Sequence, residues 1–450
     1  MPSTLATAVP ELAALGTAGA GIRIPPGVTV PLSPRVKALV DSAGFRRLAG
    51  ISQLGLVALV YPGARHSRFE HSLGVYRLAI EFLFRLQHDD RFRKIVTPDD
   101  ASAFLAAALL HDLGHWAFCH PLEDMGLPEL PRHESLLPVL VTEGEIADIL
   151  HARWGLDPGR VAGLVTESAG DPAARVLQSL LSGPIDVDKM DYLARDSLHA
   201  GVPYGNHFDQ ERLLSSLCLD EQGTALAITD KGCTAAELLV VARSVMFSEV
   251  YWHHAVRAAT AMLQRAVWLL RGAIVPAELM RFDDPSFISW ATAAAHGGPA
   301  APLVSGLFGP RRRLHKRVAM FDPSHHATVH AAVAGRRYSD LVGISHRFAT
   351  LAGARLGQPI DPDTLLIDAP PAEREIEFRL QVRERRTGGE ESSAWAWIPL
   401  AERSPLVRSL AQEQFDDVVK RVRIFAPDEL AASLSTCPGL EELVLEAASG

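Results

Sequence analysis

One apolar run constrains the fold of this chain more than any other segment, because it leads directly into a group of histidines. Residues 101–110 read ASAFLAAALL, and HDLGHWAFCH follows at once. A helix that is apolar on all sides has to be buried, so it carries His111 and Asp112 toward the interior, with Gly114 as its terminator. Burial of a carboxylate is costly unless a partner or a metal ion compensates it. We therefore expect a polar site where this helix ends.

Further histidines decide between two interpretations of that helix end. A lone His-Asp pair is more often a surface feature, where His111 interacts favourably with the helix dipole. Here His115 and His120 follow closely, and His71 opens another helix in RFEHSLGV. Because His and Asp supply the nitrogen and oxygen ligands that divalent cations prefer, the larger set favours a metal site.

A second acidic segment, IDVDKMDYLARDS from residue 185, places three polar side chains on one face of a helix. Asp188, Tyr192 and Asp196 are spaced i, i+4 and i+8, and Lys189 flanks them. The pattern is equally compatible with a solvent-exposed face and with the wall of a pocket. In the pocket, Asp188 would hold metal, Lys189 and Tyr192 would meet phosphate, and Asp196 would meet a hydroxyl.

Helical periodicity dominates the first 270 residues, whereas strand patterns gather near the C-terminus. Two short helices broken near Gly44 and a long helix from residue 72 are expected early. Residues 224–232 have the pattern of a hairpin arm. After residue 275, a linker at 293–306 precedes strands at 375–386 and 420–427. The expected fold class is mainly α, with a smaller mixed α+β C-terminal lobe.

The composition argues against several classes of protein. Lys and Arg number 44 against 53 Asp and Glu, a net charge of -9, whereas proteins that coat nucleic acid are usually basic. Four cysteines without a CxxC pair make no disulfide framework. No apolar run reaches membrane-spanning length, and the start has no basic region of the signal-peptide type. We expect a cytoplasmic protein that binds neither membranes nor nucleic acid.

Four ordered motifs together resemble a known family. RFEHSLGV, LLHDLGHWAFCH, the pair His133-Glu134 and IDVDKMDYLARDS resemble the HD-domain metal phosphohydrolases, and most of all their dNTP triphosphohydrolase branch. The resemblance spans roughly residues 30 to 270. It implies an HD-domain helical bundle as the catalytic core at 26–275, after a loose N-terminal segment at 1–25 and before an α+β lobe at 276–450.

The resemblance implies a divalent metal ion (Mn, Fe, Zn, Co, Ni or Mg) with open coordination positions for water and phosphate. Its implied ligands are His71, His111, Asp112 and Asp188. Beside the metal, the implied catalytic group comprises His115, His120, Glu123 and His133. In this branch the histidine at the place of His120 acts on the scissile bond, and Glu123 would orient it.

The same resemblance implies contacts to a nucleotide. The positions that would contact phosphate are Arg68, Lys189, Tyr192 and Arg243. Gln53 and Asp196 would hold the sugar 3'-hydroxyl, and Tyr251 would crowd the 2' position and so favour deoxyribose. Taken alone, each of these residues is more simply an ordinary helix or turn residue, and only their joint occurrence favours a site.

The chain also departs from the family pattern. IRIPPGV replaces the DPIHG-like segment of many relatives. Asp41 matches a guanine contact of nucleotide-activated relatives, but Arg46 and Ala49 replace a glutamine and an arginine, so GTP-type activation of the same form is not expected. We interpret the basic run at 311–317 as a solvated edge, the alternative being contact with a nucleotide or another subunit.

The expected function is hydrolysis of a dNTP to a deoxynucleoside and triphosphate, by a protein that forms homo-oligomers. One alternative is a nucleotidase or phosphodiesterase acting on another phosphoester, since one scaffold hosts several chemistries. Another is a nucleotide-sensing regulator with weak turnover. The intact set of ligands favours the enzyme, because a pure binder needs no open metal site beside three histidines.

Overall fold

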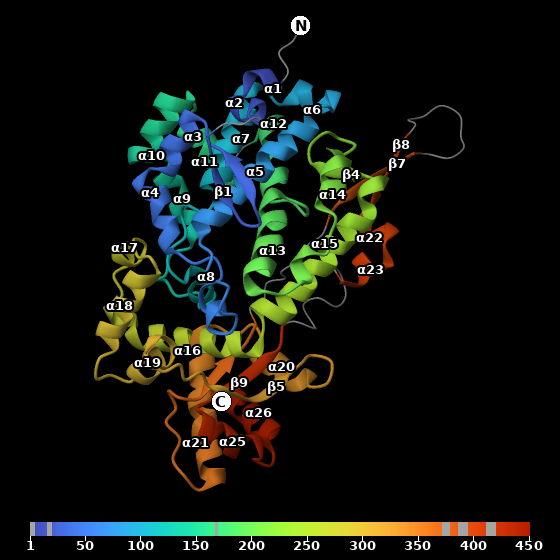
Figure 1. Ribbon diagram of the computed structural model, residues 1–450. Coiled ribbons are helices and arrows are strands. Elements are labelled where there is room, and N and C mark those ends of the chain that lie inside the picture. The colour runs from blue at the N-terminus through green and yellow to red at the C-terminus, as the bar shows by residue number, and fades with distance from the viewer. Residues whose placement is uncertain (1–4, 16–19, 167–169, 371–378, 386–394, 411–419) are drawn as a thin grey trace.

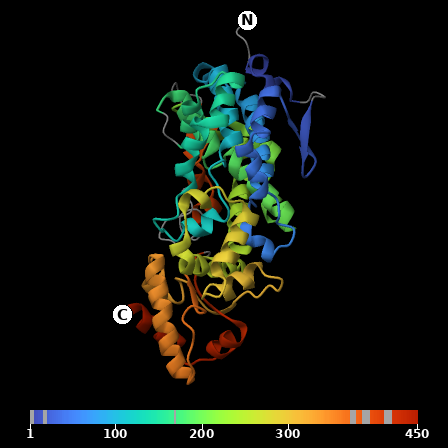
Figure 2. The same ribbon diagram turned by 90° about the vertical axis from the view of Figure 1, so that its left-hand side faces the viewer.

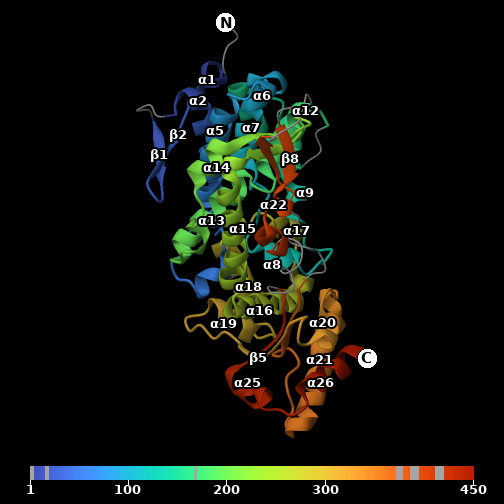
Figure 3. The same cartoon turned by 90° about the vertical axis from the view of Figure 1, so that its right-hand side faces the viewer.

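The computed structural model describes residues 5–15, 20–166, 170–370, 379–385, 395–410 and 420–450. It confirms a mainly helical chain with a smaller mixed C-terminal lobe (Figure 1). Helices α1 and α2 lie at one end of the molecule and α25 and α26 at the other (Figures 2 and 3). Within the described ranges, no helix combines the length and apolar character that crossing a bilayer requires.

The helices before residue 275 form the larger body. They are α1 (Leu5–Ala8), α2 (Pro10–Ala13), α3 (Pro34–Val40), α4 (Ala43–Arg47), α5 (Arg68–Leu86), α6 (Asp90–Ile95), α7 (Pro98–Leu110), α8 (Cys119–Glu123), α9 (His133–Thr142), α10 (Gly144–Ile149), α11 (Pro158–Val165), α12 (Pro172–Leu181), α13 (Val187–Ala200), α14 (Gln210–Ser216), α15 (Cys233–Met246) and α16 (His254–Leu270). The early break falls at Asp41 and Ser42, two residues before the expected Gly44, because the Ser42 hydroxyl caps α4.

The remaining helices lie after residue 275, and α21 is the longest of those described there. They are α17 (Pro276–Leu279), α18 (Asp284–Ala295), α19 (Ala301–Phe308), α20 (Ala327–Val333), α21 (Tyr338–Leu356), α22 (Leu400–Arg403), α23 (Pro405–Arg408), α25 (Asp428–Ser435) and α26 (Leu440–Ser449). The linker expected at 293–306 is confirmed only at residues 296–300, which form a turn, whereas 293–295 end α18 and 301–306 begin α19. Its apolar residues Leu303, Val304 and Leu307 are buried in the core that α16 also joins, which gives α19 a reason to form.

The strands form three small sheets, with β1 (Gly21–Ile24), β2 (Val28–Pro31), β3 (Leu217–Leu219), β4 (Leu226–Thr229), β5 (Lys316–Phe321), β6 (Leu366–Asp368), β7 (Gln381–Arg385), β8 (Trp395–Pro399) and β9 (Val422–Ala426). Their orders are β1-β2, β3-β4-β7-β8 and β5-β9-β6. The hairpin arm at 224–232 and the strand at 420–427 are confirmed as β4 and β9. Of the strand expected at 375–386, residues 381–385 form β7, whereas 375–378 and 386 lie outside the described residues.

Helix α7 explains how the chain delivers polar groups to its interior. Thr97 and Asp100 form a reciprocal capping box, and Pro98 occupies the first turn, so the start of the helix is well defined. All ten residues from 101 to 110 are buried, as expected for an all-apolar helix. His111 follows as the C-terminal capping residue, so the helix ends inside the protein.

Two hydrophobic cores divide the packing, and the division does not follow the chain order. The first joins the N-terminal helices with β7, α22 and α23. The second joins α16, the lobe and the segment from Trp116 to Met125. Residues 381–385 and 395–408 therefore lie with the larger body, where β7 and β8 lie beside α14 and α22 (Figures 1 and 3).

The N-terminal segment is packed where the structure describes it, although the sequence suggested a loose one. Val9 between α1 and α2 and Leu12 of α2 are buried, and Glu11 is fully buried. Glu11 accepts hydrogen bonds from the Ser33 hydroxyl at 2.5 Å and from Arg35 Nε at 2.9 Å. The apolar contacts and this ion pair together hold the segment against the body.

We predict that Glu11→Gln lowers the free energy of unfolding by about 3 kcal/mol, since it removes the charge that Arg35 compensates. Burial raises the pKa of Glu11, but the bonds from Arg35 and Ser33 outweigh this and hold it below the ordinary 4.5. The contribution is therefore present above pH 4.5 and is lost as the pH falls through the folded-state value. Thermal melts at neutral and acidic pH check this, with the exposed Glu402→Gln as control. Equal melting temperatures for Glu11→Gln and wild type at neutral pH would contradict it.

Candidate metal centre and active-site cavity

Four side chains from three distant segments converge at the end of α7. His71 Nε2 lies 3.0 Å from Asp188 Oδ1 and 3.3 Å from His111 Nε2. Asp112 Oδ1 lies 3.4 Å from His111 Nε2. Ligand atoms of His71, His111 and Asp188 all lie within 4.8 Å of one another. The structure thus brings together the four residues expected to bind metal.

Two glycines permit this convergence because a side chain at either position would collide. A Cβ on Gly74 would lie 2.0 Å from Asp191 Oδ1, so Gly74 lets α5 and α13 approach closely. A Cβ on Gly114 would lie 2.2 Å from the carbonyl oxygen of His133. These glycines keep the segments that carry the polar side chains in contact.

Hydrogen bonds fix both imidazoles with Nε2 toward the centre. His111 Nδ1 donates to the Ala108 carbonyl at 3.0 Å, and His71 Nδ1 donates to Asp191 Oδ2 at 2.9 Å. Arg195 in turn holds Asp191 through bonds of 2.7 and 2.8 Å. A carboxylate behind a ligating histidine is the usual support of a metal site.

The carboxylates at this junction are stabilised by nearby positive charge. Burial opposes protonation of His71, but hydrogen bonds to Asp188 and Asp191 and the charge of Asp112 raise its pKa to about 10. The pKa of Asp112 lies well below its ordinary value, despite burial, because of the surrounding histidines and Arg68. A divalent ion satisfies the same carboxylates, so the donor set fits the expected metal.

A second cluster lies beside the first and consists of His115, His120, Glu123 and His133. His115 Nε2 lies 3.2 Å from His120 Nε2, and the ring centroids of His115 and His133 are 3.8 Å apart. Glu123 was expected to orient His120, but it bonds to His133 instead. The His133 backbone N–H and Nδ1 both donate to it, at 2.8 and 2.9 Å, because α9 begins against α8.

Cys119 completes a possible alternative metal group with the three histidines of this second cluster. Burial raises the pKa of the Cys119 thiol to about 12, so the sulfur stays protonated at neutral pH. The three imidazoles and the thiol include no carboxylate, whereas the first cluster offers carboxylates. The first cluster is therefore the better candidate for a divalent ion.

Backbone strain is stored next to the second cluster. Phe118, which precedes α8, has a left-handed φ of 55°, a conformation that costs about 1 to 3 kcal/mol for such a residue. Its ring packs on Phe287 and Phe308, with centroids 5.2 and 5.7 Å away. This packing from later in the chain holds the turn that presents His120.

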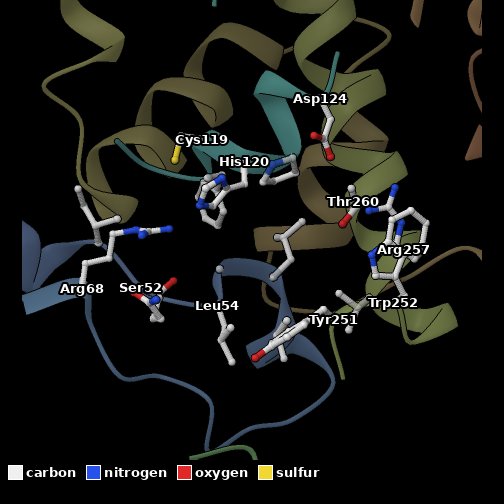
Figure 4. A pocket seen from close by; sticks show the side chains of 18 of the residues that line it. Ser52, Leu54, Arg68, Cys119, His120, Asp124, Tyr251, Trp252, Arg257 and Thr260 are labelled. Atoms are coloured by element: carbon white, nitrogen blue, oxygen red, sulfur yellow. The ribbon is translucent and has the colours of Figure 1, made fainter. Parts of the chain in front are cut away.

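A cavity of about 220 Å³ opens next to both clusters, and Gln53, Arg68, His120 and Tyr251 are among its lining residues (Figure 4). Arg68 Nη1 donates to Asp112 at 2.9 Å, which ties the cavity to the metal centre. Arg68 Nε and Gln53 Oε1 are buried and have no hydrogen-bond partner among the described residues. These polar atoms make the cavity suited to a polar ligand.

The lane on α13 lies beside this region and is partly buried, with the Asp188 side chain 32% exposed. Asp188 is at the metal centre, and Asp196 is 2% exposed and accepts from the Tyr251 hydroxyl at 2.6 Å. Tyr192 lies edge-on to Tyr251, with centroids 6.5 Å apart. Tyr251 itself ends a π-helical turn (Phe247–Tyr251), a distortion that is common at functional sites.

Two expected phosphate contacts have other partners in the structure. Lys189 Nζ donates to Asp186 at 2.5 Å. The guanidinium of Arg243 lies 5.6 Å from the ring of Phe247. Contact of either residue with phosphate stays a prediction.

Sequence reasoning missed several groups that complete the site. Asp191 and Arg195 support His71, and His66 Nε2 lies 2.8 Å from Asp196 Oδ1. Trp252 and Arg257 line the cavity. The spacing of Asp191 three residues after Asp188, and of Arg195 four residues later, was the available signal.

Comparison with known proteins agrees with this geometry. A family model of the HD domain matches residues 68–196. A second family model, of the HD associated region, matches residues 208–438, which by itself is just over half of the chain. A crystal structure of a hypothetical protein from Aquifex aeolicus has a TM-score of 0.68 at 25% identity, covering 93% of this chain and 99% of that one. A phosphohydrolase (BT4208) from Bacteroides thetaiotaomicron shares the fold, with a TM-score of 0.67 at 20% identity and coverage of 91% and 99%.

Among curated relatives, the uncharacterized protein YwfO of Bacillus subtilis is 36% identical over 50% of each chain. The deoxynucleoside triphosphate triphosphohydrolase SAMHD1 of Gallus gallus is 32% identical over 43% of this chain and 36% of its own length. The chain thus spans about half the length, or less, of these relatives. With the HD motifs assembled at one centre and both family models matched in order, the chain belongs to the HD-domain phosphohydrolase superfamily and carries an HD-associated region.

Proposed function

We propose that the protein is a metal-dependent deoxynucleoside triphosphate triphosphohydrolase, which cleaves a dNTP into a deoxynucleoside and triphosphate. One observation carries the proposal: Arg68 contacts Asp112 of the metal cluster and also lines the cavity that His120, Gln53 and Tyr251 border. A phosphate held at that junction would meet a cation, a donor and a histidine together.

His71, His111, Asp112 and Asp188 would hold the divalent ion. When bound, the ion supplies a water of lowered pKa and neutralises charge on phosphate oxygens. With the ion bound, Asp191 would keep the single proton of the His71 ring on Nδ1, which leaves Nε2 free to bind the metal.

Three side chains of the protein would act around the phosphate. Arg68 Nε would donate to a phosphate oxygen, since it has no other acceptor within the described part of the chain. Burial, and then the charge of Arg68, lower the pKa of His120 to about 3, so its ring is neutral and would pass a proton to the leaving oxygen only after taking one up. Burial, and then the charge of Arg68, lower the pKa of His115 well below its ordinary value, so His115 stays neutral beside it.

The sugar would lie between Gln53 and Tyr251. Gln53 Oε1 is a buried acceptor with no partner in the described ranges, which suits the 3'-hydroxyl. The Tyr251 ring is fixed by its bond to Asp196, so it would crowd a 2'-hydroxyl without moving away.

Distant relatives support this substrate class. SAMHD1 proteins of Gallus gallus and Danio rerio are named as deoxynucleoside triphosphate triphosphohydrolases, at 32% and 33% identity. The expected homo-oligomer and the cytoplasmic location stay predictions.

A product assay tests the proposal. With a divalent metal and a dNTP, we expect inorganic triphosphate and a deoxynucleoside, resolved by ion-exchange chromatography. Asp112→Ala should lose bound metal and at least a hundredfold of the rate, roughly the upper effect of disturbing a metal site, while it stays folded by circular dichroism. Release of monophosphate or diphosphate would instead indicate a nucleotidase or phosphodiesterase. Absence of any product would favour a nucleotide-sensing regulator.

The support of His71 is tested through metal affinity. Asp191→Asn should weaken metal binding about tenfold to a hundredfold, because His71 loses the group that orients it. Titration of the metal-free protein with Mn²⁺, followed by calorimetry, measures this. Glu81→Gln, which removes the partner of Arg77 on the same helix α5, is the matched control. Unchanged Mn²⁺ affinity in Asp191→Asn would argue against a metal at His71.

The role of Tyr251 is tested through sugar selectivity. Tyr251→Ala should reduce the preference for dNTP over NTP about tenfold, since one lost steric contact is worth about 1 to 3 kcal/mol. Tyr251→Phe keeps the ring but loses the bond to Asp196, so it should retain most of that preference. The ratios of kcat/KM for dATP and ATP report both effects. A ratio unaffected by Tyr251→Ala would refute the role.

A further inference from the structure

The second cluster, together with Cys119, has the composition and the spacing of a second cation site. Its three histidines and Cys119 offer one ligand atom each, and these four atoms all lie within 4.8 Å of one another. His115 Nε2 and His120 Nε2 are 3.2 Å apart. Two nitrogens that bind one tetrahedral zinc ion, each at about 2.0 to 2.1 Å, are separated by about 3.3 to 3.4 Å. The two rings therefore already have nearly the separation of zinc ligands.

Two of the rings are held in an orientation that suits ligation. His133 Nδ1 donates to Glu123 at 2.9 Å, and His115 Nδ1 lies 3.2 Å from the carbonyl oxygen of Asp112. A carboxylate or carbonyl oxygen behind Nδ1 is the usual support of a histidine that binds metal. With zinc bound, each ring would keep its single proton on Nδ1 and present Nε2 to the ion.

Cys119 supplies a ligand that the first cluster lacks. Its side chain is buried, and Cys119 and His120 both line the cavity, which gives an ion a path to the four groups (Figure 4). A metal ion displaces the proton even of a buried thiol, because a coordinating thiol ionises. Thiolate sulfur and imidazole nitrogen together favour zinc, whereas carboxylates favour harder cations.

The charges around the second cluster balance one zinc ion. The thiolate of Cys119 and the carboxylate of Glu123, which lies behind His133, would together supply two negative charges. The positive charge of Arg68 also acts on this cluster, but Arg68 Nη1 donates to Asp112 at 2.9 Å and is compensated there. A divalent ion would therefore leave the second cluster close to neutral, which a buried site requires.

We propose that Cys119 and the three histidines of the second cluster bind a zinc ion, separate from the ion of the first cluster, and that this zinc inhibits the protein. The ion replaces the thiol proton, which passes to solvent, and four side chains complete its tetrahedral coordination, so no position is left for water or phosphate. Zinc also occupies Nε2 of His120, so this ring can no longer pass a proton. The inhibition rests on the proposed function, whereas the site itself does not.

Cobalt(II) in place of zinc tests the site without any substrate. On addition of Co²⁺ to the metal-free full-length protein, we expect two ions per chain by elemental analysis and a thiolate-to-cobalt charge-transfer band in the near ultraviolet. Cys119→Ser should lose both the band and the second ion. Asp188→Asn, which changes a ligand of the first cluster only, should keep the band. Cys233→Ser is the matched control, because Cys233 is also buried but lies at the start of α15.

Zinc inhibition is then measured on dATP hydrolysis with Mn²⁺ in excess. We expect zinc to lower the wild-type rate about tenfold or more. Cys119→Ser should need about tenfold more zinc for the same loss, since a ligand of the ion is missing. Each rate is compared with that of the same variant without zinc, so a change in basal activity does not affect the comparison.

The two measurements separate this inference from the proposed function. A wild-type protein that takes up one cobalt ion and shows no charge-transfer band would overturn the site, as would a band that persists in Cys119→Ser. A band without any effect of zinc on turnover would overturn the inhibition. A band in a protein that hydrolyses no dNTP would uphold the site while the proposed function fails. If Cys119→Ser does not fold, Cys119→Ala takes its place.

Discussion

The arrangement of the site depends on the balance of charge around His71. Three carboxylates, Asp112, Asp188 and Asp191, surround two imidazoles where α5, α7 and α13 meet. Buried acids of this density are stable only with positive charge among them, either protons on the histidines or a metal ion. The capped start of α7, the glycines at 74 and 114 and the brace from Arg195 all serve to hold this junction together.

The second constraint is that the cavity lies between two hydrophobic cores. The segment from Trp116 to Met125 carries His120 and packs in the second core, with the lobe. His71 and Asp188 belong to α5 and α13, whose buried residues pack in the first core. The strained turn at Phe118 stands where the two meet. The geometry of the site therefore depends on how firmly the cores are joined, and Asp368 is one of the groups that join them.

The sequence was sufficient to predict the helical fold, because periodicity reports on neighbours along the chain, and the resemblance of its ordered motifs to a known family pointed to the four side chains that converge at the end of α7. That these four bind a metal ion stays a prediction. It failed where partners are distant in sequence. Glu123 was expected to orient His120, but it bonds to His133. That bond depends on how α9 packs against α8, which a local sequence pattern does not report. The linker expected at 293–306 was too long, because a run rich in Gly, Ala and Pro resembles a loop unless the core that buries Leu303 and Val304 is known. Arg257 and Asp368 are 111 residues apart, beyond any local pattern.

The parallel pairing of β4 with β7 has a topological consequence. The polypeptide leaves the larger body through α16, builds most of the lobe and comes back to add β7 and β8 to the sheet of β3 and β4 before β9 re-enters the lobe. The larger body therefore contains strands from both before and after most of the lobe residues. A single cut in the polypeptide cannot separate the lobe from the body. A fragment ending near residue 275 would leave β4 with an open hydrogen-bonding edge, the kind of surface on which foreign strands assemble.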